Sequence, residues 1–416
     1  MCYTILMTIA ILGYGKEGQS VEKYFNQKDE KTAIFDNFTN EDLKNLDLKN
    51  YSMVFRSPSV PPLDKTWTSI TKYFFDNCIC KIIGVTGTKG KGTTCSLITS
   101  ILKSLGKTIH LVGNIGNPAI DILDKIQPDD VVVYEMSSFQ LWDLNVSPNI
   151  AVVLGIEPDH LNVHKNFEEY VDAKSNIARY QKPEDVCIYN ISNEFSKQIA
   201  NTSPAKKFPY PLLNRPANLD ELLNNLYIPG KHNRDNAEAA LSAVAALYEK
   251  PLDSFINEHF SELKTGLNNF HGLPHRLEFI RELNGVKYYD DNFSTNTAST
   301  KVAIDAFPNN NLITIIGGRD KTDYADLSEL TELLNSKNVK KAVLIGESGH
   351  KLFEDYKNEK FILAETLKDA VKKARSEAES LTDSIVLMSP SAASFDMFKN
   401  VYDRGEKYQT IIKSLE

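Results

Sequence analysis

Three α/β domains in a row are the fold that this sequence predicts. Strand-like and helix-like segments alternate along the whole chain, a pattern that favours parallel sheets covered by helices. Two glycine-rich loops, GYGKEG at 13–18 and GVTGTKGKGTT at 84–94, each follow an apolar run and lead into a helix-like segment. The chain has 416 residues, and domains average roughly 150 residues, so two or three domains fit this length.

The strand runs fall into three blocks that set the expected domains. We expect a Rossmann-like N-terminal domain over 1–78, a central P-loop domain with a mostly parallel sheet over 79–271, and a Rossmann-like C-terminal domain over 272–416. The expected strands are TIAILGYG, KTAIFD and YSMVFR in the first, KIIGVTG, TIHLVG, DVVVYEM, IAVVLGI and DVCIYN in the second, and LEFIREL, VKYYDD, LITIIGG, KAVLIGE, KFILAE and SIVLMSP in the third.

Between the strands, a few segments carry their own signals. Asn284-Gly285 predicts a hairpin turn at the start of the third domain, because both positions of that turn need positive φ. A helix is expected near 65–76, and the segment 209–233 reads as a turn-rich crossing before the helix NAEAALSAVAALYE. The alanine spacing of that helix suits close packing.

Composition excludes some classes of partner and compartment. Lys and Arg number 47 against 55 Asp and Glu, a net charge of −8 that gives no reason to expect nucleic acid. The five cysteines are few and scattered, so we interpret them as free thiols; Cys78 and Cys80 form the one close pair. The apolar N-terminus is shorter than the ~20 residues of a membrane helix. We therefore expect a cytoplasmic monomer without membrane insertion, and Met7 could equally be its start.

The loop at 84–94 has the chemistry of a phosphate cradle. Successive backbone N–H groups turn toward anionic oxygens, and the positive end of the next helix adds to them. Lys91 would reach the β- and γ-phosphates of a nucleotide, and a hydroxyl just after it would bind Mg²⁺. Since Gly92 stands where Ser or Thr is usual, Thr93 or Thr94 must supply that hydroxyl.

The loop at 13–18 competes for the nucleotide. It follows a strand and opens a helix, and Asp36 ends the next strand about 20 residues on, which is the dinucleotide fingerprint. By itself this pattern would indicate NAD. The same backbone geometry would bind the diphosphate of another nucleotide equally well.

Other chemical groups stand at predicted strand ends, where α/β folds bind ligands. Glu135 ends the strand expected beside the P-loop strand, which suits a Mg²⁺ ligand. His160 and Lys174 lie in EPDHLNVHKNFEEYVDAKSNI, although a single histidine is usually a hydrogen-bonding residue and a helix lysine is usually solvated. The remaining motifs are GNIGNP, GKHNRDN, PHR, DDNFSTN, GGRDKTDY and SPSAASFDMFKN.

In this order the motifs resemble those of the Mur ligases, which build the stem peptide of peptidoglycan, and SPSAASFDMFKN is similar to the glutamate-adding members. The resemblance covers essentially the whole chain. It implies that ATP phosphorylates the carboxylate of UDP-N-acetylmuramoyl-L-alanine and that the amine of glutamate, expected to be D-glutamate, attacks the acyl phosphate. It also implies ATP, two Mg²⁺ ions and CO₂, the last as a carbamate on a lysine.

Carried over to this chain, the resemblance implies a set of site residues. The catalytic residues would be Lys91, His160 and Lys174. The ATP-binding residues would be Gly87, Thr88, Lys89, Gly90, Lys91, Gly92, Thr93, Thr94, Asn236, Arg276 and Asp291. The UDP-substrate residues would be Gly15, Lys16, Glu17, Asp36, Ser57, Asn114, Ser137 and Gln140, and the glutamate residues Thr295, Lys321 and Ser394. The Mg²⁺ ligands would be Thr93, Glu135, His160 and Lys174 as its carbamate.

Three departures from the family pattern keep alternatives open. Gly92 is closer to folylpolyglutamate synthases, Phe293 stands where a lysine is usual, and SPSV at 57–60 replaces SPG. The alternatives are a variant that adds L-glutamate, a folylpolyglutamate synthase-like ligase, and a protein that binds the UDP precursor without catalysis. An NAD dehydrogenase depends on GYGKEG alone.

Overall fold

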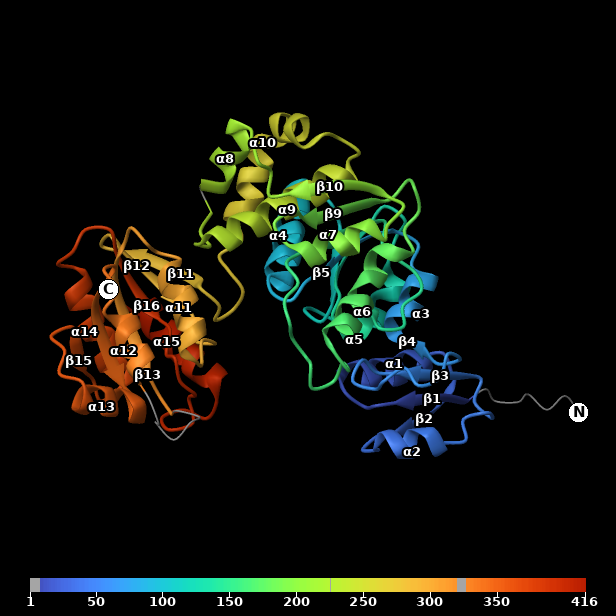
Figure 1. Ribbon diagram of the computed structural model, residues 1–416, viewed down its shortest axis with the longest axis horizontal. Helices are drawn as coiled ribbons and strands as arrows, with labels where there is room; N and C mark the ends of the chain where they lie inside the picture. Colours follow the sequence, from blue (N-terminus) through green and yellow to red (C-terminus); the bar gives the residue numbers. More distant parts are fainter. Residues whose placement is uncertain (1–7, 225, 320–326) are drawn as a thin grey trace, which may run out of the picture. The chain divides into compact units, whose positions relative to one another are not determined.

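Within residues 8–224, 226–319 and 327–416, which the computed structural model describes, the chain forms three sheets (Figure 1). It divides into two compact units, one of residues 1–225 with 235–269 and one of residues 226–234 with 270–416. The first two sheets belong to the first unit and the third sheet to the second unit. The α/β fold class predicted from the sequence is confirmed, whereas the boundaries at 78/79 and 271/272 stay predictions.

The N-terminal sheet is parallel, in the order β2-β1-β3-β4. Its strands are β1 (Thr8–Leu12), β2 (Lys31–Phe35), β3 (Met53–Arg56) and β4 (Thr68–Ser69). Its helices are α1 (Lys16–Asn26), α2 (Asn40–Asn45) and α3 (Ile70–Asn77). The helix expected near 65–76 starts later, at Ile70, because Ser69 caps it by accepting a hydrogen bond from the Lys72 amide.

The central sheet is also parallel, in the order β10-β9-β8-β5-β7-β6. Its strands are β5 (Lys81–Thr86), β6 (Ile109–Gly113), β7 (Val131–Glu135), β8 (Ile150–Val153), β9 (Val186–Asn190) and β10 (Lys206–Tyr210). Its helices are α4 (Lys91–Ser104), the 3₁₀ helix η1 (Ala119–Lys125), α5 (Ser138–Leu141), α6 (Phe167–Arg179), α7 (Glu194–Asn201), α8 (Ala217–Asn224), α9 (Lys231–Leu247) and α10 (Leu252–Asn268).

Strand β10 is a difference from the sequence prediction, which placed a turn-rich crossing from residue 209. The strand lies at the edge of the sheet and its first three residues are exposed, so it has no apolar run to mark it. It also contains Pro209, which is tolerated at a sheet edge because one side of the strand forms no ladder. Pairing with β9 decides its structure.

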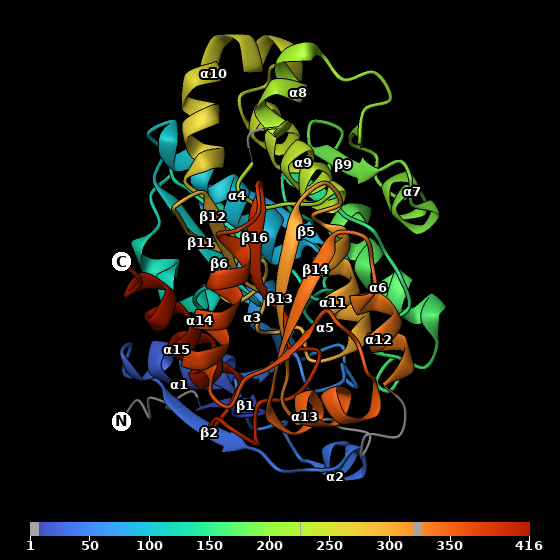
Figure 2. The same ribbon diagram turned by 90° about the vertical axis from the view of Figure 1, so that its left-hand side faces the viewer.

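The C-terminal sheet has the order β11-β12-β16-β13-β14-β15, and β12, β16, β13 and β14 lie side by side in Figure 2. Its strands are β11 (Glu278–Leu283), β12 (Val286–Asp290), β13 (Asn311–Gly317), β14 (Val339–Ile345), β15 (Phe361–Leu363) and β16 (Ser384–Met388). Its helices are α11 (Thr297–Asp305), α12 (Ser328–Leu334), α13 (Gly346–Asp355), α14 (Leu367–Ala378) and α15 (Val401–Lys413). Strand β11 is antiparallel to β12, and Asn284 (φ +53°) and Gly285 (φ +78°) form the predicted hairpin turn.

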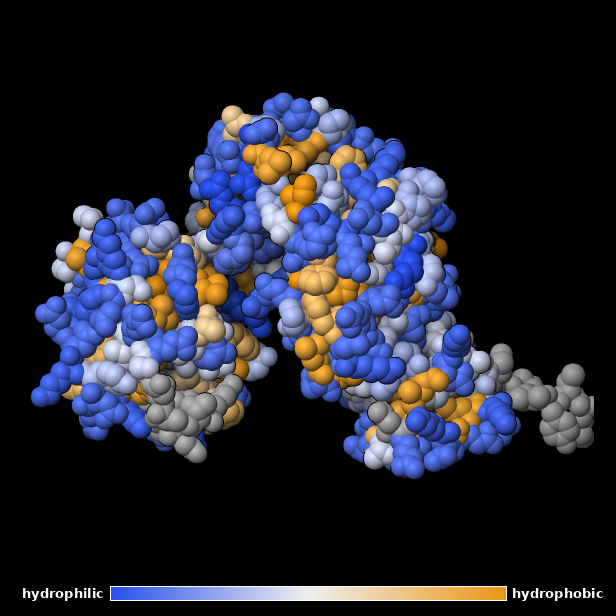
Figure 3. Space-filling view, in the orientation of Figure 1, coloured by the Kyte–Doolittle hydropathy of each residue, from blue (hydrophilic) through white to orange (hydrophobic). Residues whose placement is uncertain are grey.

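The surface of each unit is mainly hydrophilic on the face shown in Figure 3, with apolar side chains in separate groups. Exposed large apolar residues include Leu213, Phe395 and Ile79. Across the described ranges, none of the helices combines the length and the apolarity that a bilayer crossing requires.

Candidate active site

The predicted P-loop joins the carboxyl end of β5 to the start of α4. Gly90 is the N-cap residue of α4 and has φ +84°, a left-handed conformation that favours glycine. A Cβ atom at Gly90 would lie 2.7 Å from Oδ1 of Asn236, which comes from α9. The structure therefore brings the predicted nucleotide residue Asn236 directly against the loop, and a side chain at position 90 would be strained by the positive φ and would require Asn236 to move.

Two lysines meet at one carbonyl oxygen of this loop. Nζ of Lys91 donates hydrogen bonds to the carbonyl oxygens of Gly87 (2.9 Å) and Thr88 (3.1 Å). Nζ of Lys174, on α6, donates to the same Gly87 oxygen at 3.0 Å and to Oγ1 of Thr86 at 3.3 Å. The loop thus brings two lysine side chains to the carboxyl edge of the sheet, and the charge of Lys91 is what an oligophosphate requires there.

Lys174 is the unusual member of this pair, because its side chain is buried and the residue is 1% exposed. Its Nζ lies 4.8 Å from the ring centroid of Tyr170, and no carboxylate among the described residues forms an ion pair with it. Burial, followed by the charge of Lys91, lowers the pKa of Lys174 well below its ordinary value. A lysine in this setting has access to the neutral, nucleophilic amine.

Oxygen donors for a hard cation stand beside the lysines. Glu135 ends β7, next to β5, and accepts a hydrogen bond from Nδ2 of Asn114 at 3.1 Å. Thr93 lies in the first turn of α4, and the buried hydroxyl of the adjacent Thr94 makes no hydrogen bond within the described ranges. A carboxylate and hydroxyls at this edge are the donor set that Mg²⁺ prefers, so the residues present fit that ion.

The predicted ligand His160 lies near the same group. Its φ is +53°, its ring centroid is 6.5 Å from that of Tyr170, and its Nε2 is 3.5 Å from a carboxylate oxygen of Asp159. Since Lys174 lies on the same Tyr170 ring, the structure brings His160 and Lys174 to one aromatic side chain.

Sequence reasoning missed both Tyr170 and Asp159. The Tyr170 hydroxyl is 3.0 Å from Oγ1 of Thr88, so this side chain connects α6 with the P-loop. The sequence could have indicated Tyr170, because it lies four residues before Lys174 and residues i and i+4 share a helix face. Asp159 favours the protonated form of Lys174 and immediately precedes His160.

The second glycine-rich loop lies at the carboxyl edge of the N-terminal sheet. Ser57 Oγ donates a hydrogen bond to the Gly13 carbonyl oxygen at 2.6 Å, and the Tyr14 amide donates to Oδ1 of Asp36 at 3.3 Å. These contacts hold the ends of β2 and β3 against the loop that precedes α1. The predicted residues at the start of that helix are Gly15, Lys16 and Glu17.

Glu17 links this loop to the central sheet. Nε2 of Gln140, on α5, donates to Oε1 of Glu17 at 2.8 Å, while Oε2 is buried and has no hydrogen-bond partner among the described residues. Burial raises the pKa of Glu17 to about 7, against the opposing effects of Gln140 and Arg56. The sequence placed Glu17 and Gln140 at one site, and the structure brings them into contact.

Arg56 adds a second link between the two sheets of this unit. Its buried guanidinium forms an ion pair with Asp143 and donates to the carbonyl oxygens of Val60 (3.1 Å) and Phe139 (3.2 Å). Nearby, Ser137 and Gln140 form a capping box at the start of α5. These two residues therefore have a structural role, and their contact with a UDP substrate stays a prediction.

In the second unit, Asp291 is buried at the end of β12. Its carboxylate accepts hydrogen bonds from the hydroxyls of Ser294 and Ser389 (2.8 Å for Ser389) and from the Leu277 amide (3.2 Å). Burial nevertheless raises the pKa of Asp291 to about 6. Asp291 thus ties the loop after β12 to the loop after β16.

Those two loops carry the predicted glutamate residues. Thr295 lies in the loop at 291–296, and Ser394, which is buried, lies in the loop at 389–394. The Ser391 amide donates to the Ser294 carbonyl oxygen at 2.9 Å, so the loops are in direct contact. The third predicted residue, Lys321, lies outside the described residues.

Arg276 precedes β11 in the same unit and is exposed. Its guanidinium carbon lies 5.3 Å from the ring centroid of Phe293, a cation–π distance. Phe293 stands where the family usually has a lysine. The chain therefore lacks that cation, and Phe293 instead supplies an aromatic ring that Arg276 contacts.

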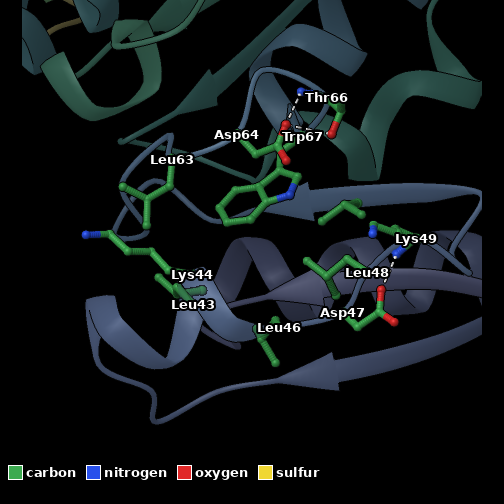
Figure 4. Close-up of a pocket in the computed structure, with 11 residues that line it drawn as sticks. Leu43, Lys44, Leu46, Asp47, Leu48, Lys49, Leu63, Asp64, Thr66 and Trp67 are labelled. Carbon is green, nitrogen blue, oxygen red and sulfur yellow. Dashed lines mark hydrogen bonds between the residues drawn. The ribbon is translucent and has the colours of Figure 1, made fainter.

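Two cavities lie elsewhere in the first unit. One of about 310 Å³ is lined by Trp67, Leu43 and Leu63 among others (Figure 4), and one of about 950 Å³ opens at the amino ends of β5, β8, β9 and β10. Neither lining contains a predicted site residue. Ligand sites in parallel α/β sheets lie at the carboxyl ends of strands, so the loops described above locate the candidate site better than these cavities do.

Comparison with known proteins matches both halves of the chain. A model of the Mur ligase middle domain matches residues 85–219, and a model described as Mur ligase, glutamate ligase domain matches residues 275–392. The UDP-N-acetylmuramoylalanine–D-glutamate ligase of Clostridium kluyveri is 35% identical, over 89% of this chain and 84% of the relative. The ligase of the same name from Clostridium tetani is 30% identical, over 98% and 96%.

Solved structures agree on the fold. A UDP-N-acetylmuramoylalanyl-D-glutamyl-2,6-diaminopimelate–D-alanyl-D-alanyl ligase from Acinetobacter baumannii has a TM-score of 0.57 at 17% identity, over 88% of this chain and 86% of that chain. The UDP-N-acetylmuramate–alanine ligase of Thermotoga maritima has a TM-score of 0.56 at 16% identity, over 98% and 99%. At these identities the likeness concerns the fold alone.

Proposed function

Because the chain belongs to the Mur ligase family, we propose that it is an ATP-dependent ligase that joins glutamate to UDP-N-acetylmuramoyl-L-alanine in peptidoglycan precursor synthesis. The observation that carries the proposal is the meeting of Lys91 and Lys174 at the Gly87 carbonyl oxygen, next to Glu135. This is a cationic P-loop with an adjoining carboxylate, as transfer of a phosphoryl group requires.

The reaction needs activation because a carboxylate is a poor electrophile at neutral pH. The γ-phosphoryl group of ATP passes to a carboxylate oxygen, and ADP leaves. The amine nitrogen of glutamate then attacks the carbonyl carbon, the C–O bond to phosphate breaks, and the amine loses a proton as the amide forms. Lys91 and the backbone N–H groups of the loop balance the negative charge on the phosphates during the first step.

Mg²⁺, when bound, screens the phosphate charge. Thr93 and Glu135 would hold one ion, while His160 and a carbamate on Lys174 would hold a second. The buried Lys174 amine supports this role, because its neutral form can attack CO₂ and lose a proton to give an anion. After incubation with ¹³C-bicarbonate, we expect a carbamate carbonyl NMR signal that is missing from Lys174→Met; identical spectra would remove the carbamate from the proposal.

The UDP portion of the first substrate and the glutamate are assigned to loops that the sequence analysis identified, and three further residues are assigned to ATP. The UDP portion would lie on the loop at 13–18 with Asp36 and Ser57, and its support is the contact of Glu17 with Gln140. Asn114, Ser137 and Gln140 would complete this site. Asn236, Arg276 and Asp291 would contact ATP, and Thr295 and Ser394 would bind glutamate together with Lys321.

The test is an end-point assay of the full chain with ATP, MgCl₂ and the UDP precursor, with D- or L-glutamate in parallel. We expect phosphate release and a product heavier by one glutamyl residue only in the complete mixture, with D-glutamate preferred, as the names of the relatives imply. Turnover with L-glutamate alone would change the assigned enantiomer. Absence of turnover with both would overturn the proposal, and a parallel reaction with a reduced folate tests the folate alternative.

A further inference from the structure

Arg404, on α15, is a buried charged side chain to which the proposed reaction assigns no role. The residue is 0% exposed, among the largest fully buried side chains of the chain. No carboxylate in the described ranges forms an ion pair with its guanidinium. Burial lowers its pKa to about 10, although Asp396 and Asp290 act in the opposite direction.

The guanidinium is satisfied by backbone and amide oxygens. Nη1 donates to the carbonyl oxygens of Ala392 (3.1 Å) and Ala393 (3.3 Å). Nη2 donates to the carbonyl oxygens of Asn292 (3.1 Å) and Ala392 (3.1 Å), and Nε donates to the side-chain oxygen of Asn292. The rigid fork of five N–H donors is what allows one side chain to reach all of these acceptors.

All of these acceptors belong to two loops. Asn292 lies in the loop after β12, between Asp291 and Thr295, and the two alanines precede Ser394 in the loop after β16. A third segment joins them, because the backbone N–H and carbonyl groups of Arg319 and Ala393 exchange hydrogen bonds at 2.8 Å. The Arg404 guanidinium therefore donates hydrogen bonds to both loops that were assigned to glutamate, and it connects one loop to the other.

We propose that Arg404 is a positioning residue for the amino-acid substrate, holding the loop at 291–296 against the loop at 389–394 so that Thr295 and Ser394 face the same ligand. The inference rests on the proposed function. A buried guanidinium that pairs with no carboxylate of the described residues is costly to fold. Its hydrogen bonds all go to two loops assigned to the amino-acid substrate, so positioning of that substrate gives its burial a reason that general stability does not. Loss of the guanidinium should therefore affect glutamate binding before it affects the nucleotide.

The experiment measures initial rates of Arg404→Met and Arg404→Lys against glutamate, ATP and UDP precursor in turn. We expect the KM for glutamate to rise at least tenfold in Arg404→Met, with the KM for ATP within twofold of the unmodified chain. Arg404→Ala should regain activity with added guanidinium chloride at millimolar concentration and not with methylammonium chloride. Lys407→Met is the matched control, since Lys407 is an exposed residue of the same helix that pairs with Asp403.

Two further measurements separate positioning from stability. Thermal unfolding shows whether each variant is folded, and Asn292→Ala removes one acceptor while leaving the arginine in place. An unchanged glutamate KM in a folded Arg404→Met would overturn the inference, as would KM values that all change together, or loss of folding in every variant. If the unmodified chain turns over neither glutamate enantiomer, the proposed function fails instead.

Discussion

The two glycine-rich loops, at 13–18 and 84–94, have the same local backbone arrangement and differ in the ionisable side chains that contact them. Each follows a buried parallel strand and precedes a helix, and each contains glycines at positive φ, Gly13 and Gly90. A buried lysine, Lys174, lies behind the second loop, whereas a buried carboxyl group, Glu17, lies beside the first. In both loops, the backbone N–H groups at the start of the following helix predict an anion-binding site. The side chains that accompany the backbone separate the two sites: Lys91 supplies positive charge to the second loop, with Lys174 behind it, and the first loop has a carboxyl group instead.

Lys91→Met tests the cationic loop and should have the largest effect. We expect kcat to fall about 10³-fold, or about 4 kcal/mol, because the side chain stabilises charge on the transferred phosphoryl group. The comparison is Lys16→Met, at the start of the helix after the other loop, which should raise the KM for the UDP precursor and change kcat less than about threefold. Steady-state phosphate release measures both. Equal losses of kcat would mean that the loops do not differ in this way.

Glu17→Gln tests the buried carboxyl group through pH. The folded-state pKa of about 7 lies above the ordinary value of 4.5, so the native state holds this proton more tightly than the unfolded chain. The stability that it contributes is present below pH 4.5 and is lost as the pH rises through 7; this amounts to roughly 3 kcal/mol. Urea unfolding should therefore find Glu17→Gln more stable than the unmodified chain at pH 8.5 and equal to it at pH 4.5.

The control for that experiment is the exposed Glu184→Gln, which changes the net charge by the same amount. If both variants shift stability equally at pH 8.5, the effect belongs to net charge and the buried Glu17 is ionised without cost.

Gly90→Ala and Gly15→Ala compare glycines of the two loops directly. Gly90 has φ +84° and a Cβ there would meet Asn236 at 2.7 Å, whereas Gly15 has φ −71° and no atom within 4 Å of a built Cβ. We expect Gly90→Ala to lose about 2 kcal/mol of stability and most ATP affinity, and Gly15→Ala to lose less than about 0.5 kcal/mol. Thermal unfolding and titration with a fluorescent ATP analogue measure these changes. A harmless Gly90→Ala would show that the loop relaxes freely.

Ser57→Ala should have a smaller effect than Lys91→Met, Glu17→Gln or Gly90→Ala. It removes the hydrogen bond from Oγ to the Gly13 carbonyl oxygen and leaves that buried oxygen without this donor, which should cost about 1 kcal/mol. The neighbouring exposed Ser59→Ala is the control. Denaturant unfolding that does not distinguish the two variants would show that the contact does not stabilise the N-terminal loop.

Much of the fold and part of the site could be predicted from the sequence. Apolar runs marked the interior strands because strands covered on both faces are apolar throughout, and Asn284-Gly285 marked its turn by its demand for positive φ. The sequence also placed the P-loop at the junction of β5 and α4 and Glu135 at the end of β7, as the structure has them; the ligand roles of these residues stay predictions. Strand β10 was missed because an exposed edge strand with a proline carries no such signal.

The sequence by itself determined the local elements, since strand runs, turns and helix starts depend on a few neighbouring residues. Only the tertiary structure decided that Lys174 and Arg404 are buried; a helix lysine such as Lys174 is usually solvated, and the sequence analysis did not single out Arg404. Their partners, Gly87 and Asn292, lie 87 and 112 positions away along the chain. Desolvation and hydrogen bonding to such distant groups set the charge state of a side chain, and local pattern does not contain them.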